Sequence, residues 1–364
     1  MNIRQIAAFA ALFVLGLTAD PSTACTGIQL TAKDGSVVHA RTLEFGEVLP
    51  PVIVAIPKGI DQVGMAPSGA PGLKWKTSYA AVGMGMQGNS FLADGVNEQG
   101  LASGLFYHPG YAKYAEPQPG EENRVIAPFQ LISYLLTTCA TVEDARLALE
   151  SVIVAPTVLK EMGFAPPIHA IVRDATGASI VIEFLNGQTV IYDNPVGVIT
   201  NDPTFDWHLT NLGNYINLSP TNVPSVMEGD LELSQLGQGS GLLGLPGDYT
   251  PPSRFIRAVA FTQSADKPES ATDAINTAFH ILDSFDIVKG VVRSAHGSSD
   301  PADFTQWTSA ADMKSGRYYF RTYANPQIRV VDLHRLDLSS GQVLYFPVDD
   351  KEPTFEDVTS KLVQ

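Results

Sequence analysis

Alternating apolar and polar residues dominate the first part of the chain. Residues 26–32 alternate, Lys33-Asp34-Gly35 is a turn signal, and residues 36–41 resume the alternation, which predicts a β-hairpin. The Gly-, Pro- and Ala-rich residues 60–77 are predicted to form a loop, and Asp94-Gly95 a turn. Further strands are predicted at residues 52–56, 79–84, 90–93 and 101–107.

Helical spacing of apolar residues begins after residue 124. Residues 125–140 are predicted to form one helix, and Thr141 is expected to cap a second helix over 142–151, because acids follow it in the first turn. Strands are then predicted at 169–173, 179–185, 189–193, 305–310, 318–323 and 328–333, with helices at 253–261 and 271–285. This order predicts a single α+β layered domain rather than βαβ winding.

The N-terminus has the pattern of an export signal. Arg4 precedes an apolar run over residues 6–17, and the small residues Ser22 and Ala24 fit a cleavage site directly before Cys25. The run is short for a membrane span, which needs roughly 20 apolar residues. An uncleaved anchor and a lipoprotein are the alternatives, although Ser22 stands where a lipoprotein signal expects an aliphatic residue.

We therefore predict a signal peptide over residues 1–24 and a single domain over residues 25–364, in a secreted or periplasmic protein without membrane contact after cleavage. Whether signal peptidase alone or a partly autocatalytic step removes residues 1–24 stays open.

The composition and net charge disfavour some classes of binding partner. Hydrophobic residues make up 45% and charged residues 17% of the chain, which is typical of a globular protein. The 38 acidic against 23 basic residues give a net charge of −15. Nucleic acids and anionic membranes attract clustered Lys and Arg, so both are disfavoured as partners.

The chain has two cysteines, and they have different surroundings. Cys139 ends an apolar helical stretch and is predicted to be a small buried side chain. Cys25 would be the first residue after cleavage, with a thiol and a free α-amine on one residue. Because an α-amine has a pKa near 8, it can accept the thiol proton. Cys25 is therefore a candidate nucleophile for acyl transfer from an amide, which also needs a cation and oxyanion donors.

The sequence contains no strong motif for binding a metal or a cofactor. The seven histidines show no His-Glu-x-x-His spacing, and no cysteine pair has metal-ligand spacing. The glycine-rich residues 237–241 lack the Lys of a phosphate-binding loop and are expected to form a flexible surface or binding loop. We expect neither a metal nor a cofactor.

Several motifs, in order along the chain, resemble one known family. They are Cys25-Thr26-Gly27, Ala40-Arg41-Thr42-Leu43-Glu44, and the stretches 94–101, 197–208 and 237–255. Together they resemble the choloylglycine hydrolase family, which contains conjugated bile acid hydrolases and penicillin V acylases among the N-terminal nucleophile hydrolases. The resemblance implies a four-layer αββα sandwich, a linear amide C–N hydrolase activity and a homotetramer.

The resemblance also implies roles for individual residues. Cys25 matches the nucleophile, and Arg41 lies beside its thiol. Glu44 stands where the family often has Asp, which orients the terminal amine. Asn201 matches the oxyanion asparagine and Arg254 the remaining active-site arginine.

One position departs from the bile acid hydrolases of the family. These carry Asn after a Gly-Leu pair, whereas Phe106 follows Gly104-Leu105 here. The backbone N–H of Phe106 is expected to remain an oxyanion donor, but the side-chain contact is lost. We therefore expect aromatic or fatty acyl amides, such as penicillin V or N-acyl homoserine lactones, to be preferred over conjugated bile salts. The alternative is an exported small-molecule binding protein of the same fold whose catalytic apparatus has lapsed.

Overall fold

The computed structural model describes residues 24–86, 90–293, 301–348 and 355–362, and its central layers are two antiparallel sheets. The first sheet has five strands in the order β1-β2-β16-β17-β18. Their bounds are β1 (Cys25–Thr31), β2 (Val37–Phe45), β16 (Phe304–Asp312), β17 (Arg317–Thr322) and β18 (Arg329–Asp332). The predicted hairpin at residues 26–41 is confirmed as β1 and β2.

The second sheet has eight strands in the order β13-β12-β11-β8-β7-β6-β3-β19. Their bounds are β13 (Gln188–Asp193), β12 (Ser179–Leu185), β11 (Ile168–Arg173), β8 (Ala102–Tyr107), β7 (Leu92–Asn97), β6 (Ala81–Met86), β3 (Pro51–Ile56) and β19 (Leu344–Pro347). All but β19 fall on or next to strands predicted from the alternation, although β7 extends through the predicted turn at Asp94-Gly95.

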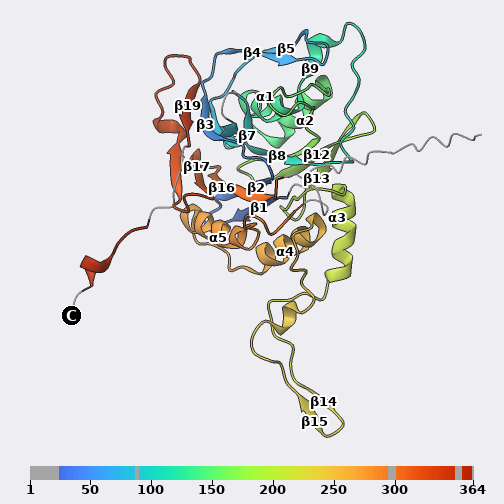
Figure 1. The fold of residues 1–364 in the computed structure, drawn as a ribbon, viewed down its shortest axis with the longest axis vertical. Helices are drawn as coiled ribbons and strands as arrows, with labels where there is room; N and C mark the ends of the chain where they lie inside the picture. The colour runs from blue at the N-terminus through green and yellow to red at the C-terminus, as the bar shows by residue number, and fades with distance from the viewer. Residues whose placement is uncertain (1–23, 87–89, 294–300, 349–354, 363–364) are drawn as a thin grey trace, which may run out of the picture.

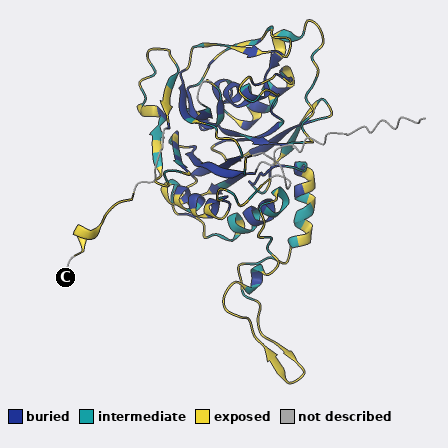
Figure 2. Ribbon diagram, in the orientation of Figure 1, coloured by how far each residue is buried: buried dark blue, intermediate teal, exposed yellow. Residues whose placement is uncertain are grey.

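Helices cover the outer face of each sheet (Figure 1). Helices α1 (Leu131–Thr138) and α2 (Val142–Ser151) pack on the eight-stranded sheet, and α4 (Pro251–Ser264) and α5 (Ala271–Asp283) pack on the five-stranded sheet. The result is the αββα sandwich that the family resemblance implies. One continuous apolar cluster includes side chains of both sheets, and the buried residues in Figure 2 follow it.

The cap of α2 agrees with the sequence, whereas the helix before it is shorter than predicted. Thr141 Oγ1 accepts a hydrogen bond from Asp144 N–H at 3.1 Å, and the Asp144 carboxylate accepts from Thr141 N–H at 3.0 Å. This is a reciprocal capping arrangement. Of the predicted helix 125–140, the first residues form the short strand β9 (Val125–Ile126), which pairs with β10 (Ile153–Val154). The 3₁₀ turn at Pro128 follows β9, and α1 begins only at Leu131.

The loop predicted over residues 60–77 is instead a hairpin of β4 (Asp61–Met65) and β5 (Pro71–Lys76). Its glycines allow a close backbone approach. A Cβ at Gly64 or Gly72 would lie 2.3 or 2.2 Å from the carbonyl oxygen of Val125. Glycine in this segment therefore reflects close packing rather than a break in the strand.

A long arm projects from the sandwich. Helix α3 (Phe205–Asn211) and the 3₁₀ turn η3 (Leu212–Tyr215) continue into residues 216–243, which we call the arm. The arm ends in a hairpin of β14 (Val226–Glu228) and β15 (Leu231–Leu233) and extends away from both sheets (Figure 1). The glycine-rich residues 237–241, predicted to be a surface loop, lie on its return path.

Cys139 is buried, as predicted, and both cysteines are free thiols. Within the described ranges, no helix combines the length and apolarity needed to cross a bilayer. The predicted signal peptide, apart from Ala24, lies outside the described residues.

Candidate active site

Cys25 is the first residue of β1, at the edge of the five-stranded sheet. It is buried and lies opposite Leu43 of β2. Its backbone nitrogen is in a peptide bond with Ala24 and donates a hydrogen bond to Asn201 Oδ1 at 2.7 Å. The structure therefore brings together two predicted site residues that are far apart in the sequence.

The hydrogen bonds of Asn201 fix the orientation of its side-chain amide. Oδ1 accepts from two donors, Cys25 N–H and Arg254 Nη2, the latter at 2.6 Å. Nδ2 donates to the carbonyl of Tyr107 at 2.7 Å. Because N–H groups can only donate and a carbonyl can only accept, the oxygen must face Cys25 and Arg254. One hydrogen of Nδ2 remains beyond the bond to Tyr107.

Arg254, from α4, braces the start of β1. Its guanidinium donates to the carbonyl of Cys25, to Thr26 Oγ1 at 3.0 Å and to Asn201 Oδ1, and its Nε donates to the carbonyl of Tyr249 at 2.8 Å. The side chain is almost fully buried. Four bonds from one rigid, charged fork hold Cys25 and Asn201 in a fixed relation.

Gly27 explains how the Asn201 segment reaches β1. Gly27 N–H donates to Ile199 O at 2.8 Å, and Ile199 N–H donates to Gly27 O at 3.0 Å. A Cβ at Gly27 would lie 2.7 Å from the Phe106 ring and 2.8 Å from Ile199 Cγ2. Only glycine allows this close approach on both sides, so the Cys25-Thr26-Gly27 motif has a packing reason as well as a chemical one.

Arg41 is fully buried beside the thiol but makes no hydrogen bond to it. Its Nη1 donates to the carbonyl of Leu105, and its guanidinium carbon lies 4.4 Å from the centre of the Phe106 ring. Burial raises the pKa of the Cys25 thiol, and the positive charge of Arg41 opposes this rise. The cation therefore favours the thiolate through space, as a nucleophilic cysteine requires.

Asp94 is a site residue whose role the sequence did not reveal. Its carboxylate lies 3.9 Å from Arg41 Nε, accepts from Tyr318 O–H at 2.6 Å and also accepts from Ser309 Oγ. Burial raises the pKa of Asp94, and Arg41 is the strongest opposing influence. The sequence predicts a turn at Asp94-Gly95, whereas both residues lie within β7 and Asp94 forms a buried ion pair with Arg41.

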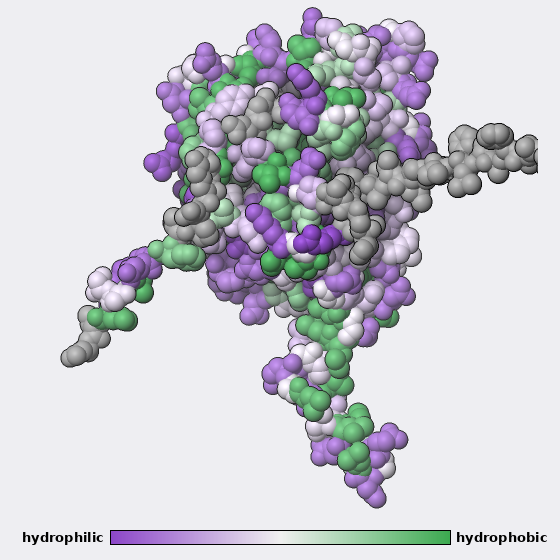
Figure 3. Space-filling model, in the orientation of Figure 1, coloured by the Kyte–Doolittle hydropathy of each residue, from purple (hydrophilic) through white to green (hydrophobic). Residues whose placement is uncertain are grey.

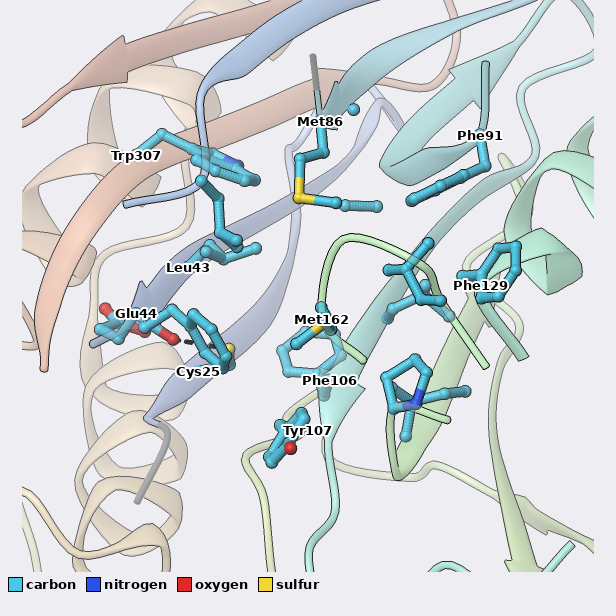
Figure 4. A pocket seen from close by; sticks show the side chains of 18 of the residues that line it. Cys25, Leu43, Glu44, Met86, Phe91, Phe106, Tyr107, Phe129, Met162 and Trp307 are labelled. Carbon is cyan, nitrogen blue, oxygen red and sulfur yellow. Dashed lines mark hydrogen bonds between the residues drawn. The ribbon is translucent and has the colours of Figure 1, made fainter. Parts of the chain in front are cut away.

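Glu44 lies next to Cys25 but contacts it only through its backbone (Figure 4). The Glu44 carbonyl is 4.0 Å from Cys25 Sγ, and the carboxyl Oε1 accepts from Thr305 Oγ1 at 2.9 Å. Burial raises the pKa of Glu44 to about 8, although Arg254 opposes the rise. Among the described residues, Glu44 Oε2 has no hydrogen bond of normal geometry. In this structure the contact to Cys25 N–H comes from Asn201, so the predicted orienting role of Glu44 remains a prediction.

The register of β8 bears on the oxyanion donor predicted at the backbone of Phe106. His108 N–H donates to Pro167 O at 2.8 Å, and Phe106 lies opposite His169 in the same register. Alternate residues of an antiparallel strand direct their N–H groups to the same neighbour. The Phe106 N–H therefore points toward β11, whereas the Tyr107 carbonyl points to the other side and accepts from Asn201. The register thus gives no support to the Phe106 donor.

The thiol of Cys25 opens into a cavity between the two sheets (Figure 4). Its empty volume is about 680 Å³, part of it open to solvent. Arg41 and Glu44 are the charged residues of its lining. Most of the wall is formed by large apolar side chains, among them Met86, Phe91, Phe129, Leu159, Met162 and Trp307. A buried thiol beside an apolar cavity suits transfer of an apolar acyl group.

Comparison with known proteins agrees with this geometry. A sequence model of the linear amide C–N hydrolases of the choloylglycine hydrolase family matches residues 25–354. The bile salt hydrolase/transferase of Clostridium perfringens (strain 13 / Type A) is 34% identical over 322 residues, which cover 88% of this chain and 95% of the relative. The penicillin V acylase of Pectobacterium atrosepticum is 26% identical over 322 residues, covering 83% of this chain and 78% of that protein.

The fold is also similar to a solved structure. The crystal structure of a mutant conjugated bile acid hydrolase from Clostridium perfringens aligns with a TM-score of 0.81 and 31% identity. The alignment covers 92% of this chain and 100% of the other.

Proposed function

The chain belongs to the choloylglycine hydrolase family and is a linear amide C–N hydrolase, and we propose that it is an exported enzyme whose nucleophile is the thiol of Cys25. The observation that carries the proposal is the position of Cys25. Its backbone nitrogen is held by the Asn201 carboxamide at 2.7 Å, while its thiol lines an apolar cavity. Removal of residues 1–24 turns that nitrogen into a free amine at the same place.

The reaction proceeds by acyl transfer in two halves. The α-amine of Cys25 accepts the thiol proton, and the thiolate attacks the amide carbon, so the carbonyl oxygen becomes an oxyanion. Collapse of this intermediate breaks the C–N bond, and the leaving amine takes the proton from the ammonium. The amine of Cys25 then accepts a proton from water as the oxygen of that water attacks the thioester. The carboxylic acid leaves and the thiol is restored.

The residues around Cys25 have separate tasks in this reaction. Asn201 Oδ1 accepts from the amine and thereby directs its lone pair, and the remaining Nδ2 hydrogen of Asn201 stabilises the oxyanion. Arg41 supplies the positive charge that favours the thiolate, and Asp94 holds Arg41 in place. Arg254 fixes the backbone of Cys25. Glu44, whose Oε2 has no other hydrogen bond of normal geometry among the described residues, accepts from the ammonium when it forms.

We propose an apolar acyl group, aromatic or long-chain, as the part of the substrate that occupies the cavity. The relatives include both a bile salt hydrolase/transferase and a penicillin V acylase. Sequence similarity alone therefore does not distinguish bile salts from penicillin V as substrates. The chemistry of the cavity does favour one class. A wall of Phe, Met and Leu side chains binds a phenyl ring or acyl chain by burial, at about 25 cal/mol per Å². The hydroxyls of a bile acid would lack partners there, which costs about 1–3 kcal/mol each.

A competition assay tests this proposal. The protein beginning at Cys25 is offered penicillin V, a long-chain N-acyl homoserine lactone and glycocholate at equal concentrations, with a Cys25→Ala variant as the control. We expect higher kcat/KM for the first two substrates and no turnover by the control. Preferential cleavage of glycocholate would refute the acyl-group assignment. Turnover by the control would refute the nucleophile.

We also propose that the mature protein is secreted or periplasmic and forms a homotetramer through the arm. Figure 3 shows apolar side chains along this projecting segment. The exposed large apolar residues of the arm are Ile216, Val223, Val226, Met227, Leu231, Leu233, Leu236 and Leu243. Such a patch, separated from the protein's own core, is typical of a contact surface for another subunit. Mass spectrometry of the exported protein should give a chain that begins at Cys25 and carries no lipid.

A further inference from the structure

The segment that carries Asn201 has no helix or strand of its own to hold it beyond Ile199. Two buried histidines from different elements hold its next two carbonyls. His169 of β11 lies with Nε2 3.0 Å from Thr200 O, and His208 of α3 lies with Nε2 3.1 Å from Asn201 O. Both rings are almost completely buried. The backbone on either side of the Asn201 amide is therefore clamped from two directions.

These contacts fix the tautomers of the two rings. A carbonyl only accepts, so each Nε2 carries a hydrogen. Burial lowers the pKa of both His169 and His208 to about 4, so both rings are neutral and each Nδ1 is an acceptor. His169 Nδ1 faces Glu183 Oε1 at 3.4 Å. Two lone pairs would meet there unless the carboxyl is protonated, and burial raises the pKa of Glu183 to about 7.

A metal ion is an alternative occupant of this cluster, since ligand atoms of His108, His169 and Glu183 all lie within 4.8 Å of one another. The ring geometry opposes it. Imidazole binds a metal along a lone pair in the plane of the ring, at about 2.0–2.1 Å for zinc. The His108 and His169 rings are stacked, with centroids 4.2 Å apart and planes inclined by only 11°. No single point lies in both planes at that distance, so the cluster suits hydrogen bonding rather than chelation.

We propose that His169 and His208 are positioning residues for the hydrolytic reaction, with Glu183 fixing the tautomer of His169. They act through Asn201, whose carboxamide must meet both the Cys25 nitrogen and the oxyanion. A displacement of about 1 Å in such a group can cost roughly 100-fold in rate. The inference rests on the proposed roles of Cys25 and Asn201 in hydrolysis.

Glu183 makes the hydrogen bond from His169 to the Thr200 carbonyl sensitive to pH. Four titratable groups face it from the elements packed around β12: His169 of β11, His108 after β8, Asp206 of α3 and Tyr192 of β13. Below about pH 7 the carboxyl keeps its proton and can donate toward His169 Nδ1. Above this pH, a carboxylate faces the His169 lone pair, and the clamp on Thr200 loosens. Activity should therefore decline on the alkaline side.

Variants of His208 test the clamp. The amide of Gln reaches about as far as imidazole Nε2, whereas the amide of Asn stops near Nδ1. We expect His208→Gln to keep kcat close to that of the parent and His208→Asn to lower kcat roughly 10- to 100-fold, with little change in KM. Thr77→Val is the matched control, because Thr77 Oγ1 also donates to a buried carbonyl, that of Pro57 at 2.8 Å, away from the site. It should lower Tm and leave kcat unchanged.

The outcomes separate this inference from the proposed function. Cys25→Ala is assayed alongside, and its inactivity against an active parent establishes the nucleophile independently. Equal kcat in His208→Gln and His208→Asn would overturn the positioning role, as would losses that follow Tm in the same way as Thr77→Val. Glu183→Gln has no carboxyl to ionise, so we expect it to remove the alkaline decline of kcat, although its amide cannot both donate to His169 Nδ1 and accept from Phe205 N–H at one atom. An unchanged pH profile, or zinc bound stoichiometrically by the parent and lost in Glu183→Gln, would refute the Glu183 assignment.

Discussion

The surroundings of Cys25 and the arm depart from the usual distribution of polar and apolar residues in opposite directions. Around Cys25, charged and polar side chains such as Arg41, Asp94 and Arg254 are buried. In the arm, large apolar side chains such as Leu236 and Ile216 are exposed. A buried polar group or an exposed apolar patch is more informative about function than a buried leucine is, because each is unfavourable unless a partner is present.

The partners differ between the two regions. The polar groups near Cys25 find theirs inside the chain: Arg254 alone contacts Cys25, Thr26, Asn201 and Tyr249. Such a network holds groups in fixed positions, as chemistry requires. The arm has hydrogen bonds at its base, where Asn222 Oδ1 accepts from Gly239 N–H at 2.7 Å, but its apolar side chains lie outside the core. The polar groups of the first region are bonded mainly within the chain, whereas the apolar side chains of the second are exposed to solvent in the single chain.

The largest expected effect is at Cys25, the proposed nucleophile. Cys25→Ser should fold normally and lose at least about 10⁴-fold in kcat, because a hydroxyl is far less acidic than a thiol and loss of a nucleophile typically costs this much or more. Steady-state amide hydrolysis measures the loss, and circular dichroism checks the fold. Turnover close to that of the parent would show that the buried network serves another purpose.

Asn201→Ala should have the next largest effect. It removes the proposed oxyanion donor, and loss of such a donor typically costs about 10²–10³ in kcat. It also removes the acceptor for the Cys25 nitrogen. We expect kcat to fall while KM changes little, and kinetics over a range of substrate concentrations measure both. A raised KM with an unchanged kcat would make Asn201 a substrate-binding residue instead.

The sequence was sufficient to predict the members of the buried network that belong to the family pattern. Cys25, Arg41, Asn201 and Arg254 do converge. It did not reveal the bonds of Asp94 to Ser309 and Tyr318, because these partners are more than 200 residues away and each is an ordinary strand residue alone. The direction of the Phe106 N–H also escaped it, since that depends on the register between β8 and β11.

The elements of the fold also divide into those that local sequence determines and those that depend on packing between distant segments. Strands with clear alternation and the Thr141 cap are local features, so they were predicted with nearly correct bounds. The sequence predicts a loop where β4 and β5 form a hairpin, because glycines that permit close packing resemble glycines that break strands. The sequence does not predict the projection of the arm, because its apolar residues form a hairpin that joins neither sheet and lies outside the core.

Glu44→Gln should change how stability depends on pH. The folded pKa of Glu44, about 8, lies above its ordinary value of 4.5, so the folded state holds this proton more tightly. The free energy of unfolding should therefore fall as pH rises from about 4.5 to about 8. Gln cannot ionise, so the variant should lose less stability over this interval. Urea unfolding at pH 5 and pH 8 measures the difference, with the exposed Glu143→Gln as control. Parallel pH dependence in parent and variant would contradict the burial argument.

The smallest effect on activity is expected in the arm. Met227 and Leu231 lie on the two strands of the terminal hairpin, and both are more than half exposed. Replacing both with Asp places charges in any interface that the hairpin forms, and desolvating an unpaired charge there is strongly unfavourable. Analytical ultracentrifugation should then show smaller species than the parent.

The activity of the same double variant sharpens the comparison between the two regions. The hairpin of β14 and β15 extends away from both sheets (Figure 1), and the residues that line the cavity include none of the arm, so kcat per subunit should stay unchanged. Glu232→Gln is the matched control, because it alters charge on the same hairpin, opposite Met227, without touching an apolar side chain. It should keep the oligomeric state of the parent. If the double variant keeps that state as well, the exposed apolar residues of the hairpin do not hold the subunits together. If kcat falls together with assembly, the buried network near Cys25 is not complete within one chain.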